Sequence, residues 1–268
     1  MSRPLLSLHA PPEGFALESL VATTYEADFG FIEEEWLPVA LGVRAPTGRH
    51  RAFRPEIEHR LAGCEVSILF DLGGCRDPRR LSRRIDLLPV FPPKLHSKVA
   101  LLAWSKVGER RLRLLVGSAN LTGQGFRENH EVMACLDFGA EDGPPRRLLA
   151  EALAHLAGMA SSPRLDAQLE RLARWRDALP PGVEAERGPW RFVDAEGVAR
   201  GLAEAWGRET PARIVLVSPF WPEGERPEEP LLRLVRAIGV PRRLELVCRS
   251  HPVSGFPVVP PSLPLRLR

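Results

Sequence analysis

The sequence has few of the features from which metal-binding, disulfide-bonded or membrane-spanning proteins are built. Its four cysteines form no C-x-x-C pair, so neither a zinc site nor a disulfide framework is expected. No apolar run approaches the roughly 20 residues that a membrane helix needs, which argues against membrane insertion. The amino terminus lacks the long apolar segment and the cleavage site of an export signal, and this favours a cytoplasmic location.

Lysine is also scarce. Of the 37 basic residues only Lys94, Lys98 and Lys106 are lysines, and the formal net charge is +3. A preference for arginine has two explanations, a high-GC genome or the binding of phosphate groups, which guanidinium groups bind well. Against this background each remaining lysine is a candidate for a specific role, and Lys98 is the strongest candidate.

The apolar content of 44% predicts an ordinary globular protein. Apolar runs and turn residues predict the elements of its first part. Strands are expected at Phe15–Tyr25, Cys64–Asp71, His96–Trp104, Leu112–Ser118 and His130–Phe138, an amphipathic helix at Asp28–Leu41, and helical structure from Arg146 to Leu179. These elements favour an α/β fold in which helices flank a β-sheet.

The order of elements restarts after the break at Pro180-Pro181-Gly182. A strand is expected at Ile214–Ser218, a helix at Glu228–Ile238 and a strand at Arg243–Cys248. We therefore predict a first domain at 1–145, a helical linker at 146–182, and the start of a second, incomplete repeat at 183–268. Because strand-helix-strand order is common, two unrelated domains are the alternative.

The segment His96-Ser97-Lys98 is the first of two motifs that carry chemistry. Successive side chains of a strand alternate between its faces, so His96 and Lys98 are expected on one face and Ser97 on the other. The second motif, Gly117-Ser118-Ala119-Asn120, follows the next expected strand. Its glycine permits close approach of the backbone, while Ser118 and Asn120 offer hydrogen-bond donors.

These two motifs resemble the H-x-K and G-S-x-N motifs of the phospholipase D superfamily, and the resemblance covers about Phe15 to Phe138. It implies a phospholipase D-like mixed sheet, with a first full repeat and the start of a second. The family usually has an aspartate four residues after the lysine, where this chain has Leu102. In this the chain is similar to the tyrosyl-DNA phosphodiesterase-like branch. The resemblance also implies that Glu131, or less well Glu128, orients the histidine.

The resemblance implies a phosphodiesterase that needs neither a metal nor a cofactor. His96 would attack phosphorus and form a phosphohistidine, while Lys98 and Asn120 bind the non-bridging oxygens. A second histidine must protonate the leaving oxygen, but no other histidine here is followed by lysine two places on. We expect the second half-site from a continuation beyond Arg268 or from the partner in a homodimer.

The substrate expected from the sequence is a nucleic acid. An arginine-rich loop precedes the first motif, and Arg80, Arg83 and Arg84, together with Gly117, are the predicted substrate-binding residues. Phospholipid is an alternative substrate, because the motifs contact only the phosphodiester. A non-catalytic half-domain that binds nucleic acid is an alternative from another functional class.

Overall fold

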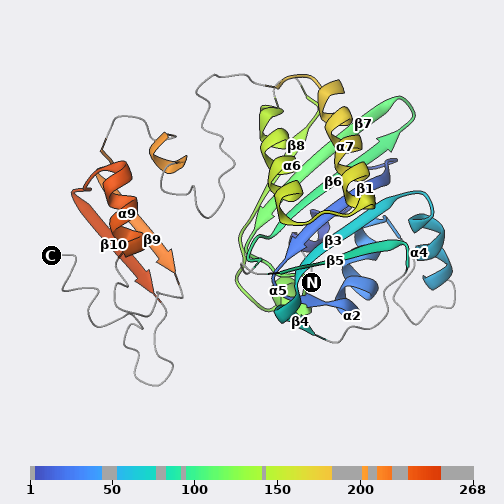
Figure 1. Ribbon diagram of the computed structural model, residues 1–268, viewed down its shortest axis with the longest axis horizontal. Helices are drawn as coiled ribbons and strands as arrows, with labels where there is room; N and C mark the ends of the chain where they lie inside the picture. Colours follow the sequence, from blue (N-terminus) through green and yellow to red (C-terminus); the bar gives the residue numbers. More distant parts are fainter. Residues whose placement is uncertain are drawn as a thin grey trace. The chain divides into compact units, whose positions relative to one another are not determined.

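A six-stranded mixed sheet lies at the centre of the first part of the chain (Figure 1). The computed structural model describes residues 4–43, 53–76, 83–91, 95–140, 143–182, 201–204, 210–218 and 229–248. The chain divides into two compact units, Met1–Gly188 and Pro189–Arg268, and each unit has its own sheet. The predicted α/β class, with a mixed sheet flanked by helices, is confirmed.

The strands of the large sheet lie in the order β5-β3-β1-β6-β7-β8. Their bounds are β1 Ala16–Thr24, β3 Glu65–Asp71, β5 Ile85–Val90, β6 Val99–Lys106, β7 Glu109–Gly117 and β8 Met133–Phe138. β1, β3 and β5 are parallel, whereas β6, β7 and β8 each run antiparallel to the preceding neighbour. One edge of the sheet therefore holds the last residues of β1, β3, β5 and β7 and the first residues of β6 and β8. We call this edge the carboxyl end of the sheet.

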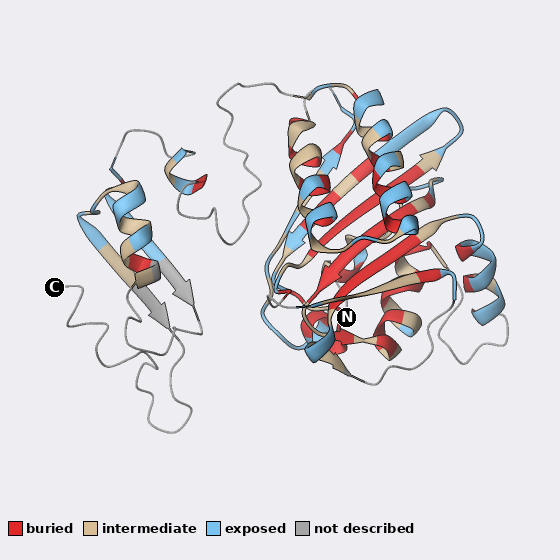
Figure 2. Ribbon diagram, in the orientation of Figure 1, coloured by how far each residue is buried: buried red, intermediate tan, exposed pale blue. Residues whose placement is uncertain are grey.

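Both faces of the sheet are covered, so its central strands are buried (Figure 2). One face packs on the short helices α1 Pro4–Ser7, α2 Phe29–Phe31, α3 Leu37–Ala40 and α4 Phe53–Leu61, with a π-helical turn at Ile32–Trp36. α6 Arg147–Met159 and α7 Pro163–Ala178 lie side by side on the other face (Figure 1). Small elements complete the unit: β2 Ala27–Asp28, a 3₁₀ turn at Leu72–Gly74, β4 Cys75–Arg76 and α5 Gly123–Arg127.

The helical segment that starts with α2 begins where the sequence predicts. Asp28 caps it by accepting a 3.1 Å hydrogen bond from the backbone N–H of Phe31. Ile32 and Trp36 are fully buried against the sheet. The apolar face expected from the sequence is thus the face that packs on the core.

α7 is tied to the sheet by a buried polar side chain. Gln168 is 1% exposed, accepts a 2.5 Å hydrogen bond from Ser67 Oγ and donates one of 2.8 Å to Ser19 Oγ. A buried amide is tolerated only when it is satisfied in this way. α6 and α7, which the sequence analysis assigns to a linker, therefore pack as part of the first unit.

The second unit contains a parallel strand pair. β9 Arg213–Ser218 and β10 Arg243–Cys248 pair in parallel, and α9 Glu229–Ile238 lies between them in the sequence. The first unit begins with the same order, because β1 and β3 also pair in parallel with helices between them. The two units share this order of elements, and a second, incomplete repeat stays a prediction.

Candidate active site

Both predicted motifs lie at the carboxyl end of the sheet. His96, Ser97 and Lys98 form an extended segment just before β6, so the prediction that the strand starts at His96 is wrong by three residues. Side-chain bonds replace the strand pairing there. Thr23 Oγ1 donates to Ser97 O at 3.0 Å and accepts from the backbone N–H of Val99 at 2.9 Å. A β-branched residue of β1 thereby fixes the segment that carries the imidazole and the ammonium group.

His96 and Lys98 lie together, and Ser97 points elsewhere. Lys98 Nζ is 3.3 Å from His96 Nδ1 and donates to His96 O at 3.0 Å. Ser97 Oγ instead lies 3.0 Å from Nε2 of His155, on α6. The alternation expected of an extended chain therefore persists through these residues.

The environment of Lys98 disfavours its charge. Burial lowers the pKa of Lys98 below its ordinary value, while the carboxylates of Glu131 and Glu26 act in the opposite direction. A partly desolvated ammonium group binds an anion more strongly than a hydrated one, because it has less water to lose. His96 is exposed and therefore accessible to a substrate.

Gly117 allows the second motif to approach the first. Its backbone N–H donates to Lys98 O at 3.0 Å. A Cβ at this position would lie 2.8 Å from the carbonyl oxygen of Val132, a distance that side chains do not tolerate. The close approach that the glycine is expected to permit is therefore an approach of its own backbone to the backbone of Val132.

Asn120 is held with its amide group in a defined orientation. Its Oδ1 accepts a 3.2 Å hydrogen bond from the backbone N–H of Glu26 and lies 3.5 Å from Thr24 Oγ1. Because a backbone N–H can only donate, the oxygen must face Glu26, which leaves Nδ2 as the donor for another group. The residue is half-buried, so this donor is partly preorganised.

Ser118 and Glu131 form a network between β7 and β8. Ser118 Oγ donates to the Glu131 carboxylate and accepts from the backbone N–H of Val132 at 3.0 Å. Asn129 Nδ2 donates to the other carboxylate oxygen of Glu131 at 3.2 Å. Ser118 is therefore engaged with Glu131. Glu128 instead ends α5, where its backbone N–H donates to Gln124 O.

Leu102 occupies the position on β6 where the resemblance implies an aspartate. Its side chain is fully buried in the core beneath the sheet. An ionised carboxylate at this position would lose its hydration without a partner, at a cost of several kcal/mol. The site must therefore work with the polar groups at the end of the sheet.

Tyr25 belongs to this site, although the sequence analysis does not select it. Its ring centroid lies 5.4 Å from that of His96, at an interplanar angle of 34°. Lys98 Nζ lies 5.9 Å from the same ring centroid. An isolated tyrosine at the end of an apolar strand gives no signal in sequence, because its neighbours are 70 residues away along the chain.

Arg83 and Arg84 are not brought to this end of the sheet. Both precede β5, and β5 runs parallel to β1 and β3, so they lie at the opposite end, about 20 Å away over six strand residues. Arg84 there forms a 3.4 Å ion pair with Glu58. They therefore do not lie beside the two motifs, and their binding of substrate stays a prediction. Arg80 lies outside the described residues.

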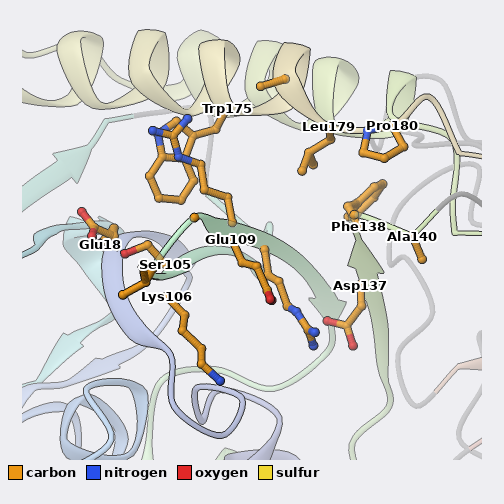
Figure 3. Close-up of a pocket in the computed structure, with 16 residues that line it drawn as sticks. Glu18, Ser105, Lys106, Glu109, Asp137, Phe138, Ala140, Trp175, Leu179 and Pro180 are labelled. Carbon is orange, nitrogen blue, oxygen red and sulfur yellow. Dashed lines mark hydrogen bonds between the residues drawn. The ribbon is translucent and has the colours of Figure 1, made fainter.

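A hollow of about 910 Å³ also lies at that opposite end (Figure 3). It is bordered by the β6–β7 hairpin, the end of β8 and the last turn of α7. Glu18 accepts a 2.5 Å hydrogen bond from Ser105, and the Arg110 guanidinium lies 4.6 Å from the ring centroid of Trp175. In Figure 3 the Lys106 side chain extends away from the helix that carries Trp175. Among the described residues, none of those lining the hollow is a histidine, so they supply no imidazole nucleophile there.

Within the described ranges, no three histidine, cysteine, aspartate or glutamate side chains are grouped so that they could hold a metal ion. None of the helices described has the length and apolar character required to cross a membrane.

Comparisons with known proteins find similarity in structure only. No protein-family model matches the chain, and no curated protein is significantly similar to it. A mutant of yeast tyrosyl-DNA phosphodiesterase aligns with a TM-score of 0.45 and 13% identity, over 80% of this chain and 47% of that one. Polyphosphate kinase from Porphyromonas gingivalis aligns with a TM-score of 0.39 and 13% identity, over 93% and 36%. The chain spans less than half the length of either protein, and its function must be argued from its own geometry.

Proposed function

We propose that the chain is a metal-independent phosphodiesterase in which His96 forms a covalent phosphohistidine. One observation carries the proposal: the end of β1 is bonded both to the segment of His96 and Lys98 and to Asn120. An imidazole, an ammonium group and an amide are thereby gathered around the same few residues. These are a nucleophile and two donors for a phosphate group.

The reaction follows from the hydrogen-bonding capacity of each group. Phosphate oxygens are better acceptors than a neutral imidazole, so Lys98 would turn from His96 Nδ1 towards a bound phosphodiester and free the imidazole lone pair. The imidazole nitrogen attacks phosphorus, and the bond from phosphorus to the leaving oxygen breaks. Water then attacks phosphorus and breaks the P–N bond, which restores His96. Lys98 and Nδ2 of Asn120 bind the non-bridging oxygens in both steps.

A second imidazole must give the leaving oxygen its proton. His155 contacts Ser97 on the α6 side, and His9 is 1% exposed within the core, so neither is suited to this role. We propose that the second half-site comes from protein following Arg268 or from a second copy of the chain. The exposed apolar side chains of Leu72, Phe91 and Val132 surround the carboxyl end of the sheet and would form the contact with that half-site.

We propose a nucleic acid as the substrate. The net positive charge and the many arginines favour a polyanionic strand, although Arg83 and Arg84 do not contribute beside the motifs. One observation favours phospholipid as a second candidate, because Leu72, Phe91 and Val132 could also receive acyl chains. A nucleic-acid-binding module without catalysis is the remaining alternative.

The test is turnover of bis-p-nitrophenyl phosphate by the full chain in the presence of EDTA, followed by mass spectrometry of acid-labile phosphohistidine. His96→Gln should lower turnover about 10,000-fold or more, because the nucleophile is lost, and should abolish the phosphohistidine. His59→Gln is the matched control, because His59 is exposed on α4. Undiminished turnover in His96→Gln would overturn the proposal. Salt-sensitive binding of single-stranded DNA without turnover would favour the module.

The substrate class is tested separately, with a labelled single-stranded oligonucleotide and with phosphatidylcholine vesicles. Cleavage of the oligonucleotide alone supports nucleic acid. Headgroup release from the vesicles alone would replace it with phospholipid.

A further inference from the structure

Tyr25 is the single tyrosine of the chain, and it lies immediately after β1. It is half-buried, with its ring beside both the imidazole of His96 and the ammonium group of Lys98. An aromatic face attracts a cation within about 6 Å of its centroid, and two rings at 4.5–7 Å stabilise each other when they are offset or tilted. One ring therefore restrains both groups of the first motif.

The backbone on each side of Tyr25 is fixed by the second motif. Thr24 Oγ1 accepts a 2.9 Å hydrogen bond from the N–H of Leu121 and donates one of 2.6 Å to Glu26 O. The N–H of Glu26 donates to Asn120 Oδ1. The residues before and after Tyr25 are thus hydrogen-bonded to the segment of Asn120, while the Tyr25 ring contacts the segment of His96.

We infer that Tyr25 is a positioning residue of the site: its ring transmits the position of the Asn120 segment to the imidazole of His96. The catalytic consequence rests on the function proposed above, whereas the geometric role does not. The phenolic hydroxyl has no part in it, because the contacts are made by the ring.

The test compares Tyr25→Phe, which keeps the ring, with Tyr25→Leu, which removes it. Phe15→Leu is the matched control, because the Phe15 ring also lies near a lysine, 5.8 Å from Lys106 Nζ, but just before the start of β1, at the opposite end of the sheet. The first measurement is NMR of the full chain labelled at histidine. The His96 ring signals, assigned by their disappearance in His96→Gln, should be shifted upfield by the tyrosine ring current in the wild type. This shift should persist in Tyr25→Phe and Phe15→Leu and vanish in Tyr25→Leu.

The second measurement is kcat/KM for bis-p-nitrophenyl phosphate. Loss of about 10- to 100-fold is expected in Tyr25→Leu, mainly in kcat, because small displacements of reacting groups are costly. Tyr25→Phe should restore the rate to within about threefold. If Tyr25→Leu fails to fold, nuclear Overhauser contacts between the Tyr25 and His96 rings of the wild type decide the geometric role, and the kcat/KM of Tyr25→Phe tests the absence of a role for the hydroxyl.

The outcomes separate this inference from the proposed function. Unshifted His96 signals in the wild type, or full activity in a folded Tyr25→Leu protein, would overturn the role of Tyr25. A wild type that turns over no phosphodiester but shows the ring-current shift would overturn the proposed function and leave the geometric role supported.

Discussion

The two ends of the large sheet differ in which polar groups their long-range contacts bring together. At the carboxyl end, Thr23, Thr24 and Asn120 each bond a segment more than 70 residues away. At the opposite end Glu18 bonds Ser105, 87 residues away, and Arg110 contacts Trp175, but no histidine is among the described residues that line the hollow there. Arginine is present at that end as well, in Arg83 and Arg84. Neither residue type nor contact between distant segments therefore locates the candidate site by itself; the gathering of an imidazole, an ammonium group and an amide at one end of the sheet does.

The largest expected difference between the two ends concerns the two lysines that flank β6. Lys98→Ala should lower kcat/KM for bis-p-nitrophenyl phosphate about 100- to 1,000-fold, because it removes a preorganised donor to the phosphate oxygens. Lys106→Ala, at the other end of the same strand, should leave it within about twofold. Steady-state kinetics at one pH and salt concentration measures both. Equal losses in the two variants would show that the comparison between the ends is wrong.

The next prediction separates stability from activity at Asn120, because its Oδ1 accepts a hydrogen bond from the backbone and its Nδ2 is proposed to bind phosphate. Asn120→Ala should lower kcat/KM about 100-fold and also destabilise the fold by about 1–3 kcal/mol, since the N–H of Glu26 loses its acceptor. Asn120→Asp keeps an acceptor for that N–H but removes the Nδ2 donor, so it should lose activity with a smaller loss of stability. Urea denaturation and kinetics separate the two effects. An active Asn120→Asp protein would contradict the proposed role of Nδ2.

Glu131 tests the electrostatics of the carboxyl end. Burial lowers the pKa of Lys98, and the carboxylate of Glu131 partly opposes this. Since catalysis requires the protonated form, kcat/KM should fall as pH rises through this lowered pKa. Glu131→Gln removes the opposing charge, which lowers the pKa further and moves the alkaline limb to lower pH.

The control for Glu131→Gln is Glu128→Gln. Glu128 is exposed at the end of α5, and it is not among the carboxylates that raise the pKa of Lys98. Its pH profile should match that of the wild type. A limb that moves in Glu128→Gln but not in Glu131→Gln would exchange the roles of these two residues.

Much of the fold could be predicted because its strands are continuous apolar runs. β1, β3 and β9 lie within one or two residues of the predicted bounds. β5 could not be predicted, since Pro89 and Asp86 obscure an edge strand in which proline is tolerated. α4 was hidden by its charged residues and Pro55. The division of the predicted 146–179 helix was signalled in sequence, because Ser162 before Pro163 is an N-cap followed by a proline at the first helical position.

The candidate site was predictable where residues are adjacent in sequence and unpredictable where they meet only in space. The H-x-K and G-S-x-N spacings identify His96, Lys98 and Asn120. Sequence order places Arg84 only twelve residues before His96, but a parallel strand intervenes and carries the chain to the other end of the sheet. Tyr25 is missed for the converse reason, since it is 71 residues from His96 in sequence and in contact with it in space.

The smallest expected effect lies in the hollow. Arg110 is exposed, and its guanidinium lies 4.6 Å from the centroid of the buried Trp175 ring. Arg110→Ala should reduce the free energy of unfolding by about 0.5–1 kcal/mol, since an exposed cation–π contact contributes little more, and should leave kcat/KM within about twofold. Arg110→Met retains most of the aliphatic stem over the indole and should recover part of that stability. Urea denaturation of the three proteins measures these differences. A large loss of turnover in Arg110→Ala, with stability unchanged, would mean that the hollow takes part in catalysis and that the two ends of the sheet act as one site.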